Sequence, residues 1–235
     1  MVAIVVRSAT PGSVGEVNSD CGPRGNLARN DQRNEEGYRS NAMRAVPANR
    51  YFVFFSIAIA GCALDLATKS WAFGRLGAIA GPPMWLWPDV FGFQTNLNEG
   101  ALFGMGQRMV AMFVGLSLLA AVGIQSWLFI AGAARDWLLT VALGCVTAGI
   151  FGNLYDRLGF PGLTWPAGHP HHAAGETVYA VRDWILVMIG DWPWPTFNIA
   201  DSFLVCGAIM LIGHVIWIQP KNDQKAAQEM PSGDA

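Results

Sequence analysis

Four long apolar segments constrain this chain most strongly, because each has the composition of a helix that crosses a lipid bilayer. A spanning helix needs about 20 mostly apolar residues, since the hydrocarbon core is roughly 30 Å thick. The second segment carries no charged residue at all. The sequence therefore predicts a mainly α-helical, polytopic membrane protein with four transmembrane helices, at residues 51–67, 109–134, 137–155 and 197–218.

Charged residues are concentrated at the two ends of the chain. Of the 32 Lys, Arg, Asp and Glu residues, 12 lie in residues 1–50 and 5 in residues 219–235. The long middle is thus far poorer in charge than soluble domains, in which roughly 25% of residues are charged. This distribution excludes an ordinary soluble globule. A net charge of −2 also gives no reason to expect nucleic acid as a partner.

The polar ends are predicted to be cytoplasmic tails. Residues 1–50 are rich in Asn, Gly, Ser, Pro and Arg without apolar periodicity, and we expect them to be disordered. Met43 is an alternative start of translation, and residues 219–235 form the second tail. With the N-terminus inside, ten Lys and Arg residues lie on the cytoplasmic side and five on the other. Segments 70–108 and 156–196 are then outside.

The two outer segments are rich in Trp, as is typical of chain lying at a membrane interface. Residues 90–97 also have the composition of a β-strand. The sequence therefore predicts a small extracytoplasmic β-containing segment on the membrane surface. The Trp residues concerned are Trp71, Trp85, Trp87, Trp165, Trp184, Trp192 and Trp194.

Four acids fall where an ionised group is costly, and such groups are functional candidates by default. Asp65, Asp156 and Asp201 lie at the expected outer ends of three helices. Asp183 lies within an apolar run, residues 181–189, that can form a strand with this carboxylate on an apolar face. The turn-rich residues 190–196 can fold the chain back and bring Asp183 near Asp201. The alternative is that these acids are simply solvated at the interface.

Two of the acids follow an Asn by three residues, which places both side chains on one helix face. These pairs are Asn153 with Asp156, and Asn198 with Asp201. Arg157 gives Asp156 a neighbouring partner and suggests a structural role for it, whereas Asp201 has no such neighbour. Two carboxylates that share a proton can act as base towards water and acid towards a carbonyl, as peptide hydrolysis by an aspartic dyad requires.

Five short motifs resemble those of the bacterial lipoprotein signal peptidase family, or signal peptidase II. They occur in the family's order and cover about residues 51–218. The motifs are Asp65-Leu-Ala-Thr-Lys69, Asn98-Glu-Gly-Ala-Leu-Phe-Gly104, Gly152-Asn-Leu-Tyr-Asp-Arg157, Val181-Arg-Asp-Trp-Ile185 and Phe197-Asn-Ile-Ala-Asp201.

This resemblance implies a membrane aspartic endopeptidase of the bacterial inner membrane. Such enzymes remove signal peptides from diacylglyceryl-modified prolipoproteins by cutting just before the lipidated cysteine, without a metal or cofactor. The resemblance makes Asp183 and Asp201 the catalytic pair. It also implies prolipoproteins and membrane lipids as partners and a monomeric enzyme. Further residues would support the pair or line the site: Asn153, Asp156, Arg157, Asn198, Asp65, Lys69, Asn98 and Gly100.

The chain departs from the family pattern at several places. Leu102 replaces a family Ala, Ala148 stands where Gly is common, and Arg182 and Trp184 flank Asp183. Residues 163–180 are an insertion, so Asp156 is kept as a second choice of partner for Asp201. Within the pair, we expect Asp201 to be ionised by its position in the first turn of a helix, and Asp183 to hold the proton.

Two other functions were weighed. His169, His171 and His172 suggest a metal site, but no Cys lies nearby and Glu176 is the only close acid. A small proton-coupled transporter could use Asp65, Asp156 and Asp201 as a relay. Such a relay needs ionisable groups along the path to the inner face, and the second to fourth segments have almost none besides His214. The clustering of the acids at one end favours a hydrolase.

Overall fold

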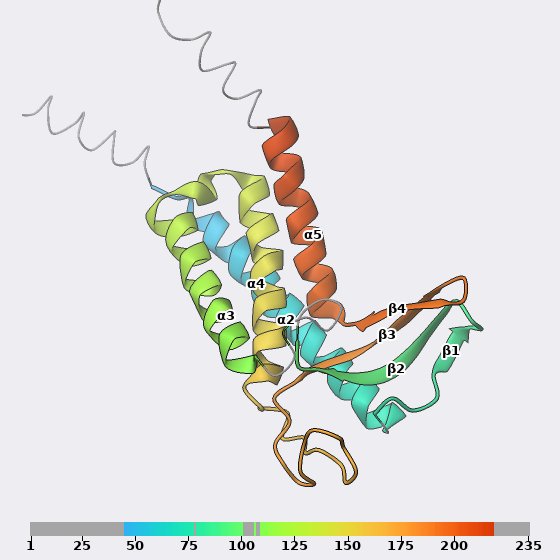
Figure 1. Cartoon of the computed structure of the whole chain (residues 1–235). Coiled ribbons are helices and arrows are strands. Elements are labelled where there is room, and N and C mark those ends of the chain that lie inside the picture. The colour runs from blue at the N-terminus through green and yellow to red at the C-terminus, as the bar shows by residue number, and fades with distance from the viewer. Residues whose placement is uncertain (1–44, 78, 101–105, 107–108, 219–235) are drawn as a thin grey trace, which may run out of the picture. The chain divides into compact units, whose positions relative to one another are not determined.

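A computed structural model describes residues 45–77, 79–100, 106 and 109–218. Four helices in it are long and apolar enough to cross a membrane, so the predicted fold class is confirmed (Figure 1). Residues 1–44 and 219–235 of the expected tails, with Met43, lie outside the described residues, as does Leu102, whereas residues 48–50 of the expected first tail are helical and begin α2. The helices are α2 (Ala48–Leu76), α3 (Val110–Gln125, continued by a π-helical turn Ser126–Ile130), α4 (Trp137–Arg157) and α5 (Ile199–Gly213, continued by His214–Ile218).

Helix α4 is the central helix of the bundle, with α2, α3 and α5 packed against it. Its apolar stretch is 61% buried, whereas those of the other three helices are at most 22% buried. Small residues allow this close packing, as in other membrane helix bundles. A Cβ added at Gly149 would lie only 2.5 Å from the Ala200 carbonyl oxygen of α5.

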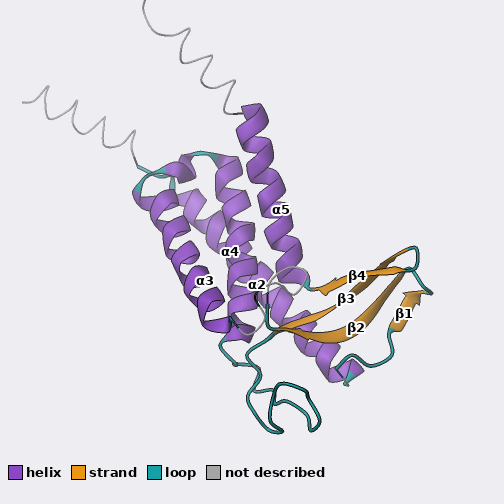
Figure 2. Cartoon of the chain, viewed as in Figure 1, coloured by secondary structure: helices purple, strands orange, loops and turns teal. Residues whose placement is uncertain are grey.

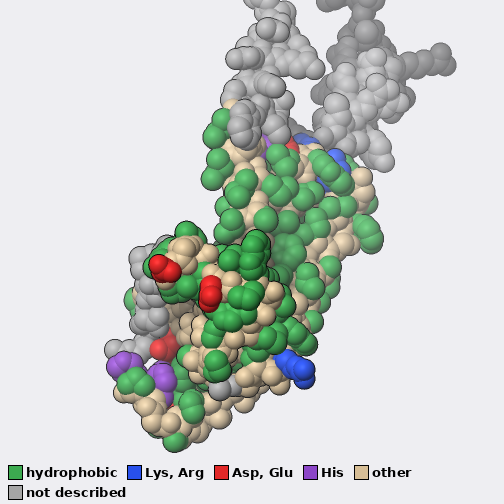
Figure 3. Space-filling view, turned by 90° about the vertical axis from the view of Figure 1, so that its right-hand side faces the viewer, with side chains coloured by type: hydrophobic (Ala, Val, Ile, Leu, Met, Phe, Trp, Pro, Cys, Tyr) green, Lys and Arg blue, Asp and Glu red, His purple; other side chains and the backbone are tan. Residues whose placement is uncertain are grey.

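The outward faces of the helices are hydrophobic, as Figure 3 shows over much of the surface of the bundle. Phe52 on α2, Leu119 on α3 and Ile209 on α5 are each more than 60% exposed. Exposed apolar side chains on this scale require a partner or a lipid environment. They therefore agree with helices that are surrounded by lipid.

Two helices differ in length from the segments expected from hydropathy. Helix α2 continues through Asp65 and Lys69 to Leu76, whereas the sequence reading ended it near residue 67. The charges do not end the helix because they pair with each other one turn apart. The second spanning helix ends at Ile130 rather than near residue 134, and Gly132, with φ of 83°, turns the chain towards α4.

A four-stranded antiparallel sheet lies beside one end of the bundle (Figure 2). Its strands are β1 (Met84–Trp87), β2 (Phe91–Asn98), β3 (Val181–Ile189) and β4 (Trp192–Phe197), in that spatial order. An aromatic layer joins the sheet to the last turns of α2, because Trp184 and Ile185 of β3 pack with Ala72 of α2.

The β3–β4 hairpin brings β3, which follows the long connection after α4, close to the start of α5. A tight turn at Gly190, with φ of 62°, reverses the chain, and Ile185 of β3 pairs with Phe197 of β4. Asp183 is therefore close to the residue that follows β4, Asn198. On its other side β3 pairs with β2, where Asp183 lies opposite Asn96.

Candidate active site

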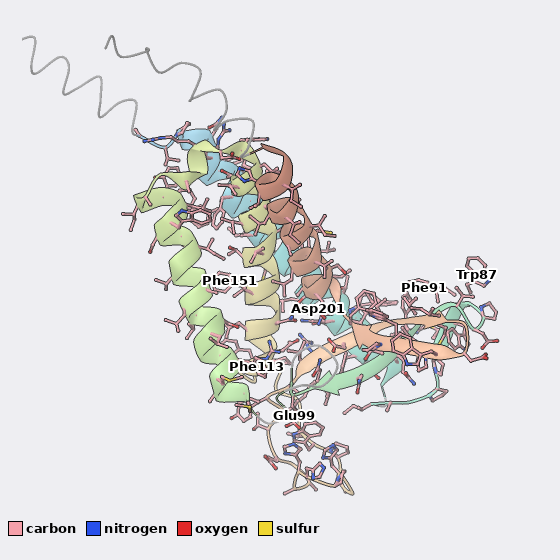
Figure 4. The ribbon with its side chains drawn as sticks, turned by 45° about the horizontal axis from the view of Figure 1, so that its top comes forward. Trp87, Phe91, Glu99, Phe113, Phe151 and Asp201 are labelled. Atoms are coloured by element: carbon pink, nitrogen blue, oxygen red, sulfur yellow. The ribbon has the colours of Figure 1, made fainter. Side chains whose placement is uncertain are left out.

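The four acids singled out in the sequence gather where α2, α4, α5 and β3 meet. Asp65, Asp156 and Asp183 are at most 2% exposed, and Asp201 is partly buried. Figure 4 shows Asp201 at the start of α5, next to the inner end of the sheet. Asp183 and Asp201 are held by amide groups, whereas Asp65 and Asp156 are bound to cations.

Asp183 is a buried carboxyl group held by two amide side chains. The Asn198 Nδ2 group donates to Asp183 Oδ1 at 2.6 Å, and Asn98 Nδ2 donates to Asp183 Oδ2 at 3.2 Å. Burial is the main cause that raises the pKa of Asp183 to about 8, and the negative charge of Asp201 raises it further. Asp183 thus favours its protonated form at neutral pH.

Asp201 forms a capping box with Asn198 at the N-terminus of α5. The Asp201 backbone N–H donates to Asn198 Oδ1 at 2.9 Å, and the Asn198 backbone N–H donates to Asp201 Oδ2 at 3.2 Å. Asn153 of α4 donates from Nδ2 to the other oxygen, Asp201 Oδ1, at 2.8 Å. These donors and the positive end of the helix dipole surround the Asp201 carboxylate with partial positive charge.

Asn198 and Asn153 connect the two acids into one network. The fully buried Asn198 side chain contacts Asp183 and also donates to Asn153 Oδ1 at 3.2 Å. Asn153 Oδ1 in turn accepts a hydrogen bond from Lys69 Nζ at 2.9 Å. The sequence reading paired Asn153 with Asp156, but its amide is directed across the helix interface to Asp201 instead.

Lys69 binds the remaining two acids from the middle of the bundle. Its fully buried ammonium lies 2.7 Å from Asp65 Oδ2 and 3.0 Å from Asp156 Oδ2. Asp65 Oδ1 accepts the backbone N–H of Ala200 at 2.8 Å, in the first turn of α5. The ion pair between Lys69 and Asp65 thereby links α2 to both α4 and α5.

Asp156 is paired with Arg182 and not with its neighbour Arg157, which corrects the expectation from the sequence. Arg182 donates from Nε to Asp156 Oδ1 at 2.9 Å and from its backbone N–H to Oδ2 at 3.1 Å. Consecutive residues on a helix point in different directions, so Arg157 is directed elsewhere. Its Nη2 donates to the Gly100 carbonyl at 2.8 Å, and its guanidinium lies 5.0 Å from the centre of the Phe113 ring.

Arg182 is the main contributor that sequence reasoning missed. From the sequence it was named only as a departure from the family pattern beside Asp183, yet its side chain pairs with Asp156 of α4. The available signal was its place in an apolar strand, because a buried guanidinium requires an anionic partner. With Lys69 and Arg182 both bound to Asp156, that carboxylate is unsuited to serve as the second choice of partner for Asp201.

The charges of the cluster almost balance. Four carboxylates face three cations, namely Lys69, Arg182 and Arg157. The charge of Arg157 acts on both Asp183 and Asp201. Buried charge is stable only when it is compensated, so one additional proton would make the cluster neutral. The raised pKa of Asp183 makes this carboxyl group the favoured site of that proton.

No metal centre is formed by the residues that the structure describes, since none of their His, Cys, Asp and Glu side chains form a group of three suited to hold an ion. His172 instead lies 2.9 Å from Glu99 and 3.1 Å from Glu176. The expected site residues Asn98 and Gly100 both contact the cluster, through Asp183 and Arg157 respectively.

A bundle of four membrane helices with four acids gathered together is the arrangement expected of a membrane-embedded aspartic peptidase. Comparison with known proteins specifies the family. The sequence profile described as Signal peptidase (SPase) II matches residues 57–217. This chain belongs to the signal peptidase II family.

Relatives with curated names support the same assignment. A lipoprotein signal peptidase of Rhodopirellula baltica is 49% identical over 170 residues, which cover 72% of this chain and 73% of the relative. One from Rhodococcus jostii is 29% identical over 200 residues, covering 85% of this chain and 90% of the relative. One from Methylorubrum extorquens is 30% identical over 158 residues, covering 66% and 80%.

Solved structures share the fold. A bacterial membrane enzyme determined by the in meso method is 24% identical, with a TM-score of 0.56 over 76% of this chain and 93% of that one. A second structure of this kind is 23% identical, with a TM-score of 0.55 over 70% and 93%. The four-helix bundle with its attached sheet is therefore a known membrane-enzyme architecture.

Proposed function

We propose that Asp183 and Asp201 are the catalytic dyad of an endopeptidase that cleaves prolipoproteins. The observation that carries the proposal is the shared contact with Asn198, whose amide donates to Asp183 and whose backbone forms the capping box with Asp201. Both acids are thereby held beside the same residue. Asp156 and Asp65, in contrast, are occupied by Lys69 and Arg182.

The different surroundings of the two acids support different roles for them in the proposed reaction. Ionised Asp201 accepts a proton from a water molecule while the oxygen of that water attacks the carbonyl carbon of the scissile peptide. Protonated Asp183 donates its proton to the carbonyl oxygen, which gives a neutral tetrahedral diol. Collapse of the diol breaks the C–N bond, and the proton on Asp201 passes to the leaving amine. The diol's hydroxyl returns a proton to Asp183, which restores the starting state.

The substrate proposed is a diacylglyceryl-modified prolipoprotein, cut just before its lipidated cysteine. The named relatives are lipoprotein signal peptidases, and the helices have apolar outer faces suited to lipid. An apolar groove of about 660 Å³ between α2 and α4 includes Phe151, labelled in Figure 4. A lipid-bearing substrate can therefore approach the bundle without leaving the membrane.

The orientation proposed is that of a multi-pass protein of the bacterial inner membrane with both termini in the cytoplasm. The supporting pattern is the excess of Lys and Arg on the side of the tails. The site and the sheet would then lie at the outer face. We propose that the enzyme acts as a monomer, because all the acids and cations of the cluster come from one chain.

A proton-coupled transporter is not favoured by the family or by the geometry. Its relay would use Asp65, Asp156 and Asp201, but Asp65 and Asp156 are bound to cations. His214 lies at the opposite end of the bundle, 2.7 Å from Asp136, which caps the first turn of α4. Within the described part of the four helices, no Asp, Glu, Lys, Arg or His side chain lies between these two ends.

The dyad is tested with purified enzyme and a synthetic diacylglyceryl prolipoprotein. Asp183→Asn and Asp201→Asn should each lower kcat by about 100- to 10,000-fold, the range for loss of a general acid or base. The exposed Asp191 in the β3–β4 turn provides the control, since Asp191→Asn should cleave as the wild type does. Wild-type kcat in either dyad variant would contradict the assignment.

A further inference from the structure

The segment between α4 and β3, which includes the insertion at residues 163–180, forms a small lobe over residues 159–180 with its own core. Trp165, Val178 and Ala180 are each at most 4% exposed and pack together. A short bridge between Thr164 and Thr177 closes the base of the lobe. Leu97 of β2 packs against this core, so the lobe contacts the strand that leads into the active site.

His172 links the lobe to the loop that follows β2. Its Nε2 lies 2.9 Å from Glu99 Oε1, and its Nδ1 lies 3.1 Å from Glu176 Oε1. The imidazole also stacks on Trp165, with ring centres 4.3 Å apart and an interplanar angle of 1°. The side chains of His172 and Glu99 are only 12% and 15% exposed, so the lobe holds this pair away from most solvent.

Glu99 stands between two residues that contact the reactive cluster. Asn98, before it, donates to Asp183, and Gly100, after it, accepts from Arg157 through its carbonyl. The Gly100 backbone N–H also donates to Asn98 Oδ1 at 3.0 Å, which closes the loop on itself. A side chain that fixes Glu99 therefore restricts both neighbours at once.

We propose that His172 is a positioning residue for the peptidase site. It holds Glu99, and through the loop of residues 98–100 it keeps the Asn98 amide on Asp183 and the Gly100 carbonyl on Arg157. This inference rests on the proposed role of Asp183 in catalysis. The proposed role gives the insertion a function in organising the site. This function is indirect, because no residue of the lobe contacts either acid of the dyad among the described contacts.

The link is strongest when His172 is protonated. Partial desolvation lowers the pKa of His172, but hydrogen bonds to Glu176 and Glu99 and their negative charges outweigh it and raise the pKa overall. The titratable groups facing the ring are Glu99 from the β2–α3 loop and Glu176 and His169 from the lobe. The linked state is therefore present below this raised pKa and is lost as pH rises through it.

The proposal is tested with His172→Ala, His172→Gln and the exposed neighbour His171→Ala. Removal of the ring should lower kcat about three- to fivefold, the size of a partly exposed ion pair, with KM nearly unchanged. A Gln amide can donate to both glutamates, so His172→Gln should recover much of kcat at neutral pH. The ratio of wild-type to His172→Gln kcat should fall as pH rises, because Gln does not titrate. His171→Ala should match the wild type.

Hydrogen exchange gives a second measurement that does not depend on cleavage. The backbone amides of residues 98–100 should exchange faster in His172→Ala than in the wild type, and His171→Ala should leave them unchanged. If the wild type cleaves substrate, and His172→Ala has the wild-type kcat and the wild-type exchange rate at residues 98–100, the positioning role is overturned while the dyad stands. If the wild type does not cleave but exchange changes as expected, the dyad fails and the link between lobe and loop is supported.

Discussion

At the scale of single residues, Asn198 explains how Asp183 and Asp201 are kept beside each other. Its amide donates to Asp183, its side-chain oxygen accepts from the Asp201 backbone, and its own backbone N–H donates to the Asp201 carboxylate. Only Asn and Gln carry a carbonyl acceptor and an NH2 donor on one planar amide, and Gln is one carbon longer. The pair of acids is thus organised by a helix cap.

The pH dependence of cleavage should report the proton on Asp183. Its pKa is raised to about 8, and above this value the dyad loses the proton that the carbonyl oxygen needs. We therefore expect kcat/KM to fall as pH rises through about 8. The Asn98 amide favours the ionised form of Asp183, so Asn98→Ala should raise the pKa further and move this alkaline limb to higher pH.

The control for this measurement lies two residues away on the same strand. Asn96 is exposed and donates to Thr196 at 3.1 Å rather than to Asp183, although it lies opposite Asp183 in the sheet. Asn96→Ala should therefore leave the alkaline limb in place. An identical shift in both variants would mean that the Asn98 amide does not tune Asp183.

The residues of the site could be found in the sequence more readily than their partners. Motif and position indicated all four acids, and turn chemistry indicated that the chain returns from β3 towards α5. Pairings across elements were out of reach, because spacing along one helix describes only neighbours on that helix. Asp156 therefore received Arg157 as its expected partner, whereas β3 supplies Arg182.

At the scale of elements, the close contact of α4 with α2 and α5 sets the geometry of the cluster. Gly152 lies where all three helices meet, and a Cβ added there would lie 2.5 Å from Asp65 Oδ2 and 3.0 Å from the Ala200 Cβ. Such separations are too short for non-bonded atoms. The missing side chain at Gly152 is thus a condition for the ion pair of Asp65 with Lys69.

Gly152→Ala should therefore destabilise the enzyme by about 1–3 kcal/mol, the usual cost of overpacking, and should also reduce cleavage. Gly115 in α3 provides a matched control, since a Cβ added there meets no atom within 4 Å. Gly115→Ala should be neutral or slightly stabilising, because Ala favours helix. Thermal unfolding in detergent measures both variants, and equal melting temperatures for the two would refute the packing argument.

The elements themselves were largely predictable from hydropathy, but their ends were not. Length and apolar composition identified the four helices, since lipid admits few alternatives. The first helix was predicted to end too early, because Asp65 and Lys69 were interpreted as the limit of the membrane rather than as a buried ion pair. The order of the sheet joins strands from two distant segments, and local composition carries no information on such pairing.

At the scale of the whole molecule, the proposed orientation can be tested by labelling. Cys21, Cys62, Cys145 and Cys206 are first replaced by Ser, and single cysteines are then introduced at exposed positions. Asp191→Cys in the β3–β4 turn should react with a membrane-impermeant maleimide in intact spheroplasts. Asn49→Cys at the start of α2 should react only after permeabilisation. The opposite pattern would invert the topology, and it would place the dyad at the inner face.

The capping box also determines when a newly made chain can become active. Asp201 lies in the first turn of α5, the last of the four described spanning helices, and Asp183 precedes it on the other strand of the β3–β4 hairpin. A nascent chain that has not yet inserted α5 contains three of the four acids but lacks the proposed dyad. If Asp183 and Asp201 form the dyad as proposed, a nascent chain can cleave proteins that emerge beside it only after α5 has been made.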